Sequence, residues 1–417
     1  MALKAYAVRA VHCHHQASDE AVYEALRRAT DPLERAWARL GQARRIAVKF
    51  NQDKASQRVV MLAGQRQQLV SDSVMRAVLR LLRERTDAEI VCADVSFYVM
   101  YNGETLENTC NAAPILRAFG VPYLDGTRPP YRVAEPPGGG LMFRRYTMME
   151  GVLEADAVVS VATIKNHAFM GVTGCLKNLF GLMPGEPHGR PRTYYHHLVR
   201  MPGMLADIGR MLDPALNIVD ALVGQAGQEW SAHGPPEGRI VDALIAGDHV
   251  IATDAVMMHL MGHDPRADWL TPPFHRDRNP LLVAAEGGFG TVKLEEIDYA
   301  SEVAPQPEGT FFAMRTDPPE VNLAWRRSMC EQALYYRENP HVFERYAGEY
   351  ILLQEGEVRW HSPEGTIRTS RRALAGRRPD QAMFYKFVDP QEAEGERFEV
   401  YERALAQIEG LEPIPFN

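Results

Sequence analysis

The stretch Ala155–His197, ADAVVSVATIKNHAFMGVTGCLKNLFGLMPGEPHGRPRTYYHH, decides how the rest of the chain is interpreted. It begins with a largely β-branched run, Ala157 to Val161, which is typical of a strand buried in a sheet. The run leads to Lys165, Asn166 and His167, and then to a glycine-rich segment with a basic, histidine-rich tail. This pattern predicts a buried strand that delivers polar side chains to a site.

Length and composition place the chain among ordinary globular proteins. Its 417 residues favour two domains, and 46% hydrophobic with 24% charged residues excludes disordered and fibrous classes. The net charge of −8 gives no overall attraction to nucleic acid. The amino terminus has no signal-peptide pattern, and no apolar run approaches membrane-spanning length. We therefore expect a cytoplasmic protein that binds neither nucleic acid nor membrane.

The cysteines are five in number, widely scattered and never arranged as C-x-x-C; they are Cys13, Cys92, Cys110, Cys175 and Cys330. An odd, scattered set argues against a disulfide scaffold or a zinc ribbon. It also argues against an iron–sulfur cluster bound by this chain.

Strand and helix patterns alternate along residues 1–304. The strand-like segments include 5–12, 44–52, 88–97, 121–125, 157–161, 216–222 and 239–247. The helical segments include 19–40, 71–85, 110–119, 205–212 and 254–261, with Ser71 as an N-cap. This alternation predicts an α/β fold, a mostly parallel sheet flanked by helices. Residues 224–238, GQAGQEWSAHGPPEG, are interpreted as a long exposed loop.

The pattern of predicted helices and strands changes at about residue 305. A proline-rich linker and an aromatic helical stretch, 325–336, precede two strands joined by a tight Glu355-Gly356 turn. A basic helix, 370–378, and a strand, 382–388, follow. Residues 305–417 are therefore predicted to form a small C-terminal α+β module, in which no chemistry is visible.

Polar side chains gather where the predicted strands end: Lys49, Asn51, Asp94, Ser96 and Asp125 all follow a buried run, as does the Lys165–His167 triplet. Parallel sheets place their ligands at this edge. We therefore predict a site in which Asp94 is catalytic and Lys49, Asn51 and Lys165 bind a ligand or cofactor.

Lys177 follows His167 by ten residues, and the glycines around it allow backbone N–H groups to approach a bound molecule. His167 is predicted to act as acid or base, and Lys177 as an anion anchor or a nucleophilic amine. Asn178 and Arg192 are predicted ligand-binding residues. The alternative is structural: Lys177 and Asn178 cap a helix, and Arg192 is a solvated loop residue.

Two adjacent histidines close the stretch. Either His196 or His197 is a candidate ligand of a divalent metal, and the sequence does not choose between them. Adjacent histidines are also common on protein surfaces.

A second histidine cluster, His12, Cys13, His14 and His15, lies near the amino terminus. On a strand, alternation would place His12 and His14 on one face and Cys13 and His15 on the other. We therefore interpret the cluster as a polar strand end rather than a metal site.

Several familiar motifs are absent from the sequence. It contains no G-x-S-x-G elbow, no G-x-x-x-x-G-K-[ST] loop, no H-E-x-x-H, and no G-x-G-x-x-G after the first strand. Hydrolase and nucleotide-enzyme functions are disfavoured.

The segment IKNHAFMGVTGCLKNLFGLMPG, followed by RTYYHH and later by IAGDHVIATDAVMMHLMGHDP, resembles the domain-of-unknown-function family numbered 362. The resemblance covers about Arg45 to Pro265, and its most specific part is G-x-x-K-N-x-x-G, Gly174 to Gly181. Many members of that family are fused to ferredoxin-type clusters. The resemblance implies no particular activity.

The same stretch is more distantly similar to the nickel-pincer lactate racemase family. The resemblance implies that His167 is an acid or base, that Lys177 carries the cofactor covalently, and that His196 or His197 ligates nickel. The chain has Gly174-Cys175 where that family has paired glycines, and no second histidine lies near Asp94. A shared fold is therefore implied more strongly than a shared cofactor.

Two functions follow from these patterns. The first is an enzyme for a small polar or anionic organic molecule, using metal-assisted isomerisation or redox chemistry. The second is a non-catalytic scaffold that holds an anion or a ferredoxin-type redox partner. The oligomeric state is not indicated.

Overall fold

The computed structural model describes residues 4–229, 236–369, 371–375 and 382–410. Its largest element is a nine-stranded sheet with the order β13-β1-β12-β11-β9-β2-β5-β6, in which β10 pairs with β9. The strands are β1 Tyr6–His12, β2 Arg45–Phe50, β5 Glu89–Asp94, β6 Tyr123–Asp125, β9 Ala157–His167, β10 Gly171–Thr173, β11 Leu216–Ala226, β12 Glu237–Gly247 and β13 Ile297–Ser301.

The sheet is mostly parallel. The central pairs β11–β9, β9–β2, β2–β5 and β5–β6 are parallel, whereas β12 runs antiparallel to both β11 and β1. The carboxyl ends of the parallel strands therefore lie at one edge of the sheet. The α/β prediction, with a mostly parallel sheet flanked by helices, is confirmed.

The β-branched run of β9 explains why helices cover both faces of the sheet. All eleven residues of β9 are buried. Alternate residues point to opposite faces: Val159 and Val161 join one apolar core, and Val158 and Ala162 join the other. A strand apolar on both faces has to be covered on both sides.

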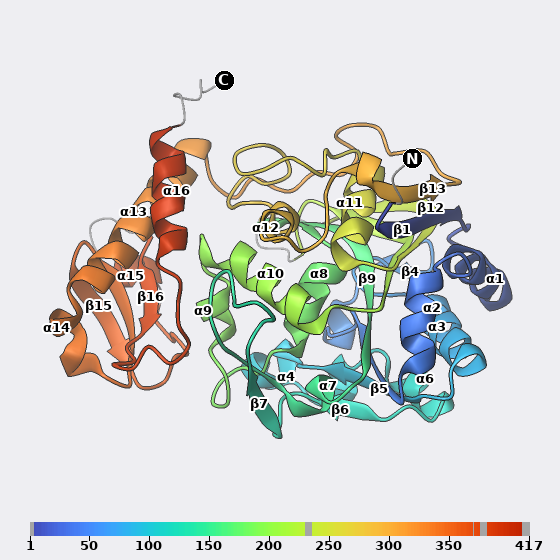
Figure 1. The fold of residues 1–417 in the computed structure, drawn as a ribbon, viewed down its shortest axis with the longest axis horizontal. Helices are drawn as coiled ribbons and strands as arrows, with labels where there is room; N and C mark the ends of the chain where they lie inside the picture. Colours follow the sequence, from blue (N-terminus) through green and yellow to red (C-terminus); the bar gives the residue numbers. More distant parts are fainter. Residues whose placement is uncertain (1–3, 230–235, 370, 376–381, 411–417) are drawn as a thin grey trace.

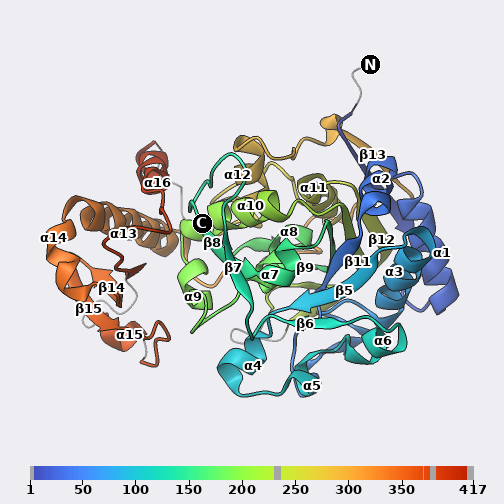
Figure 2. The same ribbon diagram turned by 60° about the horizontal axis from the view of Figure 1, so that its bottom comes forward.

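One face is covered by α1 Asp19–Thr30, α2 Glu34–Gln42, α3 Asp72–Arg85 and α6 Ala113–Ala118. The other is covered by α8 Cys175–Asn178, α10 Arg200–Leu212, α11 Val250–Leu260 and α12 Pro280–Glu286. Figure 1 and Figure 2 show the two groups on opposite sides of the strands. The remaining helices and strands of this part are α4 Phe97–Asn102, α5 Leu106–Thr109, α7 Glu150–Leu153, α9 Arg192–Tyr195, β3 Met61–Leu62, β4 Gln65–Arg66, β7 Tyr131–Ala134 and β8 Tyr146–Met149.

The C-terminal part forms a small α+β module beside the large sheet (Figure 1). In the described residues, a three-stranded sheet, β15-β14-β16, is accompanied by four α-helices and one short 3-10 helix, Glu344–Tyr346. The strands are β14 Tyr350–Gln354, β15 Glu357–Ser362 and β16 Phe384–Phe387, and the helices are α13 Pro319–Glu338, α14 Pro340–Phe343, α15 Arg371–Leu374 and α16 Glu399–Glu409.

A fully buried ion pair joins this module to the large part. Arg200 at the start of α10 contacts Glu396 at 2.7 Å, and both side chains are 0% exposed. Arg200 also donates to the carbonyl oxygens of Tyr194 and Tyr385. The module is therefore packed onto the large part rather than attached by a linker alone.

Three local predictions differ from the structure. The helix predicted at 19–40 is two helices, because Pro32 cannot continue a helix and the chain breaks at 31–33. Residues 224–226 are strand, and Gln228 is 0% exposed, so the predicted exposed loop at 224–238 is wrong there; residues 230–235 lie outside the described part. The helix predicted at 370–378 is described only at 371–374.

Within the described residues, no helix is both long enough and apolar enough to cross a membrane.

Candidate functional site

A cavity of about 780 Å³ lies at the carboxyl edge of the central strands. Its lining residues are Lys49, Asn51, Asp53, Lys54, Gln68, Leu69, Asp94, Val95, Phe97, Tyr98, Tyr101, Lys165, His167, Phe169, Thr173, Lys177, Asn178, Gly181, Pro191, Arg192, Thr193, His196, Glu229, Arg276, Thr366, Ile367 and Thr369. The predicted site residues therefore meet in one space, with the exception of His197. The last three lining residues come from the C-terminal module.

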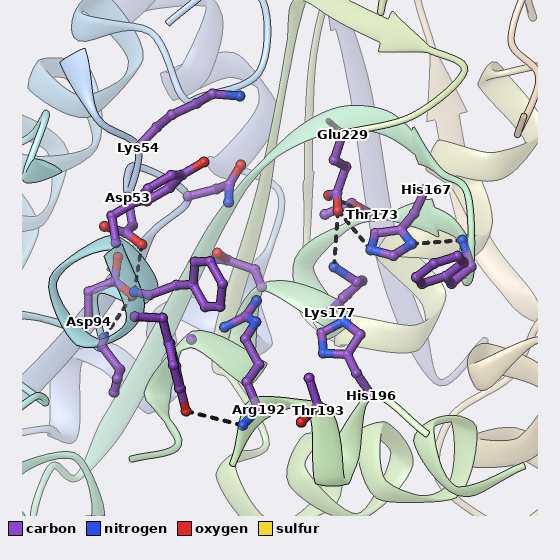
Figure 3. Close-up of a pocket in the computed structure, with 18 of the residues that line it drawn as sticks. Asp53, Lys54, Asp94, His167, Thr173, Lys177, Arg192, Thr193, His196 and Glu229 are labelled. Carbon is purple, nitrogen blue, oxygen red and sulfur yellow. Dashed lines mark hydrogen bonds and ion pairs between the residues drawn. The ribbon is translucent and has the colours of Figure 1, made fainter. Parts of the chain in front are cut away.

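Glu229 is the centre of the most polar corner of the cavity. Its Oε2 lies 2.7 Å from His167 Nε2 and 3.6 Å from Lys177 Nζ. Its Oε1 accepts from Thr173 Oγ1 at 2.8 Å and lies 3.5 Å from Lys165 Nζ. Figure 3 shows His167 and Lys177 pointing toward this carboxylate. Burial raises the pKa of Glu229, but His167, Lys177 and Lys165 together hold it well below its usual value.

Both ring nitrogens of His167 are engaged. The backbone N–H groups of Phe169 and Met170 donate to Nδ1 at 3.1 and 3.2 Å, so Nδ1 is an acceptor. Nε2 therefore carries the proton of the neutral ring and donates it to Glu229. Burial, with the charge of Lys177, lowers the pKa of His167 to about 4, against the opposing attraction of Glu229. The ring is neutral at pH 7.

Lys177 is held at the cavity wall by α8. The carboxylate of Asp254 accepts from the N–H groups of Cys175 and Leu176, each at 2.8 Å, and so fixes the first turn of this short helix. Gly174 is needed for this approach, because a Cβ there would lie 2.5 Å from Asp254 Cγ. Burial raises the pKa of Asp254 to about 7.

The Lys177 amine makes no hydrogen bond to any described residue, and its nearest acid is Glu229 at 3.6 Å. Burial lowers the pKa of Lys177 to about 8, with Arg192 and Lys165 adding repulsion and Glu229 opposing it. Lys165 differs, since it donates to Asn51 Oδ1 and to the Gln68 carbonyl oxygen, each at 3.0 Å. Lys177 is therefore the amine of this corner that is least committed to the protein.

Lys49 and Asp94 form a saturated pair at the opposite end. Lys49 Nζ lies 3.0 Å from Asp94 Oδ1 and donates to the Phe50 carbonyl oxygen at 2.7 Å. Gln52 donates to the other Asp94 oxygen at 2.8 Å. Asn178 accepts from Lys49 Nζ and donates to the Lys49 carbonyl oxygen. These contacts join β2, β5 and α8, so the three predicted residues Lys49, Asp94 and Asn178 position the cavity wall.

Arg192 lies between the two ends (Figure 3). Its guanidinium stands 4.6 Å from the centre of the Phe180 ring and 5.4 Å from that of Phe97. No ion pair connects it to a described acid, and burial lowers its pKa. A half-buried guanidinium with aromatic neighbours and no ion pair to an acid of the described part is suited to binding an anionic ligand.

The structure separates the two adjacent histidines. His196 lines the cavity, with its ring stacked 6.1 Å from that of His167 and edge-on to Phe180 at 4.9 Å. His197 faces the C-terminal module, where its Nε2 accepts from the Tyr385 backbone N–H at 2.9 Å. The candidate assignment of His197 as a metal ligand in the site is therefore corrected, because its ring points out of the cavity.

Comparison with known proteins places most of this site in a recognised segment. Residues 59–259 match the family model named Domain of unknown function (DUF362). The chain resembles the DUF362 family. This confirms the resemblance predicted from the G-x-x-K-N-x-x-G core, and the family name describes no activity.

The chain is also similar to a curated protein and to a solved structure. The Thylakoid-associated protein sll1697 of Synechocystis sp. is 27% identical over 157 residues, which are 36% of this chain and 45% of that protein. The chain thus matches less than half of the length of this relative. The lactate racemase apoprotein from Thermoanaerobacterium thermosaccharolyticum is 14% identical with a TM-score of 0.36, covering 61% of this chain and 57% of that one.

Within the DUF362 segment, sequence reasoning missed Glu229. It stands in a glycine-rich polar stretch with no periodic pattern, and only the length of β11 carries it into the cavity. Lys54 and Asp53 were also missed, although they follow the predicted strand end at Asn51. Burial raises the pKa of Asp53 to about 6 and lowers that of Lys54 to about 8.

Among the residues that the structure describes, the cavity does not bring three histidine, cysteine or acidic donors together closely enough to hold a metal ion. His196 offers one imidazole, whereas His167 is engaged on both sides. A metal in this cavity would therefore take further ligands from water or a bound molecule.

Proposed function

We propose that this protein is an enzyme acting on a small organic anion, and that Lys177 moves a proton to and from the substrate. The observation that carries the proposal is a buried amine with a pKa of about 8 and no hydrogen bond to a described residue, in a cavity of about 780 Å³. A group titrating near the working pH can act as both base and acid.

The charges of the cavity support an anionic substrate. Six lysine and arginine side chains line it among the described residues, against the three acids Asp53, Asp94 and Glu229. Lys49 is neutralised by Asp94, whereas Arg192 has no described acid partner. A carboxylate or phosphate would balance this excess of positive charge, with Arg192 as one anchor.

Under this proposal, neutral Lys177 removes a proton from the carbon beside the substrate carboxylate. The C–H bond breaks, an N–H bond forms, and the electron pair is delocalised into the carboxylate, whose charge the cations stabilise. Return of the proton to the same face regenerates the substrate, and delivery to the opposite face gives isomerisation without a further reactant. His167 then acts through Glu229, which it holds in place, rather than as the acid or base predicted from the sequence.

The test is hydrogen exchange in D2O. A panel of 2-hydroxy, 2-oxo and dicarboxylic acids is incubated with the full-length protein, with and without added divalent metals, and followed by proton NMR. We expect loss of the α-proton signal from one class of acid, and no loss with Lys177→Ala. Lys293→Ala is the matched control, because Lys293 is 56% exposed and, among the described residues, forms its ion pair with Glu296 alone. Exchange that survives Lys177→Ala would remove Lys177 from the chemistry.

A second candidate is a non-catalytic protein that binds an anion or a ferredoxin-type redox partner. The engagement of both His167 nitrogens favours it, since that ring has no free lone pair for a substrate. Tight anion binding without any α-proton exchange would support this function. Metal analysis and the intact mass of the purified protein test whether the cavity holds a cofactor. A mass adduct on Lys177, or a stoichiometric metal that is lost in His196→Ala, supports a cofactor there. A cytoplasmic location remains a prediction.

A further inference from the structure

Of the amino-terminal histidine cluster, only His12 lies on a strand. β1 ends at His12, so the alternation that would separate neighbouring side chains stops before His14 and His15. These two residues follow the strand in an irregular segment and turn. Their ring centroids lie 4.3 Å apart, with the ring planes tilted by 31°. The geometric reason for interpreting the cluster as a strand end therefore does not apply to this pair.

A bulge in the neighbouring strand brings a carboxylate to the same place. Val241 and Asp242 of β12 lie opposite the single residue Leu222 of β11, because the register shifts by one residue. Asp242 takes a positive φ of 56°, a conformation that aspartate tolerates better than most residues. The backbone N–H of Cys13 donates to the Asp242 carbonyl oxygen at 2.9 Å, which ties the end of β1 to the bulge.

The carboxylate meets the histidine pair directly. Asp242 Oδ1 lies 2.8 Å from His15 Nδ1 and accepts from the His15 backbone N–H at 2.6 Å. The ligand atoms of His14, His15 and Asp242 all lie within 4.8 Å of one another. The His15 side chain is 11% exposed and that of Asp242 is 27% exposed, whereas His14 is exposed. The site is thus fixed on one side and open to water on the other.

We propose that His14, His15 and Asp242 bind a divalent transition metal of the Zn²⁺, Co²⁺ or Ni²⁺ class. A set of two imidazoles and one carboxylate binds these ions in preference to Mg²⁺ or Ca²⁺. Water completes the coordination. Metal–ligand distances of about 2.0–2.2 Å require the donors to approach one another. The exposed His14 ring makes this adjustment, since its only described polar contact is acceptance from the Gln16 N–H at 3.1 Å. The site is independent of the cavity and of the proposed enzyme function.

Binding is measured on the full-length, metal-stripped protein by calorimetry with ZnCl2, and by the visible absorption of added Co²⁺. We expect one equivalent of Zn²⁺ per chain and a Zn²⁺-dependent rise in Tm, because an ion that binds only the folded state stabilises it. His14→Ala is expected to weaken binding by at least about tenfold, the lower limit seen when even indirect partners of metal ligands are removed. Asp242→Asn is expected to do the same while keeping a residue type that accepts positive φ.

Two controls make the result decisive. His12→Ala changes a histidine of the same cluster that is not a member of the three-donor group, and His196→Ala removes the imidazole in the cavity. Neither is expected to change Zn²⁺ affinity. The proposal is overturned if the wild-type chain binds no Zn²⁺, if His14→Ala binds as tightly as wild type, or if His196→Ala abolishes binding.

Discussion

Two buried charge clusters in this protein have opposite character. At the module interface, Glu396 accepts from Arg200, Lys386 and Tyr401 at 2.6 to 3.1 Å, and neither carboxylate nor guanidinium is exposed. In the cavity, Lys165 and Lys177 approach Glu229 only to 3.5 and 3.6 Å. Close pairing with full hydrogen bonding is typical of a structural cluster. Loose sharing of one carboxylate leaves cations with capacity for a ligand.

The largest expected effect is at the interface. Glu396→Gln leaves Arg200 and Lys386 buried without their shared anion, and we expect the free energy of unfolding to fall by about 3–5 kcal/mol. Urea unfolding measures this change. Glu402→Gln is the control, because Glu402 forms an exposed pair with Arg337 and should lose about 1 kcal/mol or less. Equal losses in the two variants would show that the interface pair is not structural.

The same substitution in both clusters sharpens the comparison. Lys386→Met removes a buried lysine that contacts Glu392 and Glu396 at 2.7 and 3.0 Å, and should destabilise the fold by about 3 kcal/mol. Lys177→Met removes an amine without hydrogen bonds to described residues, and should change stability by about 1 kcal/mol or less. Its effect should instead appear in calorimetry with malonate, as at least tenfold weaker binding (about 1.4 kcal/mol). If Lys177→Met lost more stability than Lys386→Met and bound malonate as tightly as wild type, the cavity cluster would be the structural one.

The contributions of the two clusters to stability should also change with pH at opposite ends of the pH scale. The charges of Arg200 and Lys386 outweigh burial and hold the pKa of Glu396 at about 2, below its ordinary 4.5. Its stabilisation is therefore present above about pH 4.5 and is lost as the pH falls toward 2. Unfolding in urea from pH 6 to 3, compared between wild type and Glu396→Gln, measures this loss.

In the cavity the pKa of Lys177 is also lowered, but the effect falls in the alkaline range. Burial lowers the pKa of Lys177 to about 8 from 10.5, so the folded state releases this proton first. Its contribution to stability therefore rises between pH 8 and 10.5, while anion affinity falls, by up to about tenfold per pH unit above 8. Malonate calorimetry from pH 6.5 to 9.5 tests the second effect. Lys177→Arg keeps the charge and should flatten the profile.

The smallest expected effect is at the contact between the C-terminal module and the rim of the cavity. Glu186 accepts from the Gly365 N–H and from Thr366 Oγ1 at the cavity rim, and a Cβ on Gly365 would lie 2.3 Å from Pro191 Cγ. Gly365→Ala should therefore displace this contact, cost about 1 kcal/mol and weaken malonate binding severalfold. The control is Gly41→Ala, where a Cβ meets nothing within 4 Å. Unchanged binding in Gly365→Ala would place the module outside the ligand site.

The sequence predicted the sheet because the buried runs of β2, β5 and β9 are strongly apolar and alternate with amphipathic helices. It predicted most of the site for the same reason, since Lys49, Asp94 and Lys165 lie at the ends of those runs. Glu229 was beyond such reasoning, because its burial depends on where an eleven-residue strand ends in space. Thr366 and Ile367 were missed because no local pattern indicates packing against a distant loop.

The place of β1 in the sheet has a consequence for biosynthesis. β1 lies between β12 and β13, and its first pairing partner is the segment around Ala243 to Gly247. Chains emerge from the ribosome amino terminus first. The Tyr6–His12 segment therefore waits, unpaired, while more than half of the polypeptide is translated. Its docking is a late event in the assembly of the sheet, and nascent chains stalled before β12 expose unpaired strand edges that are prone to aggregation.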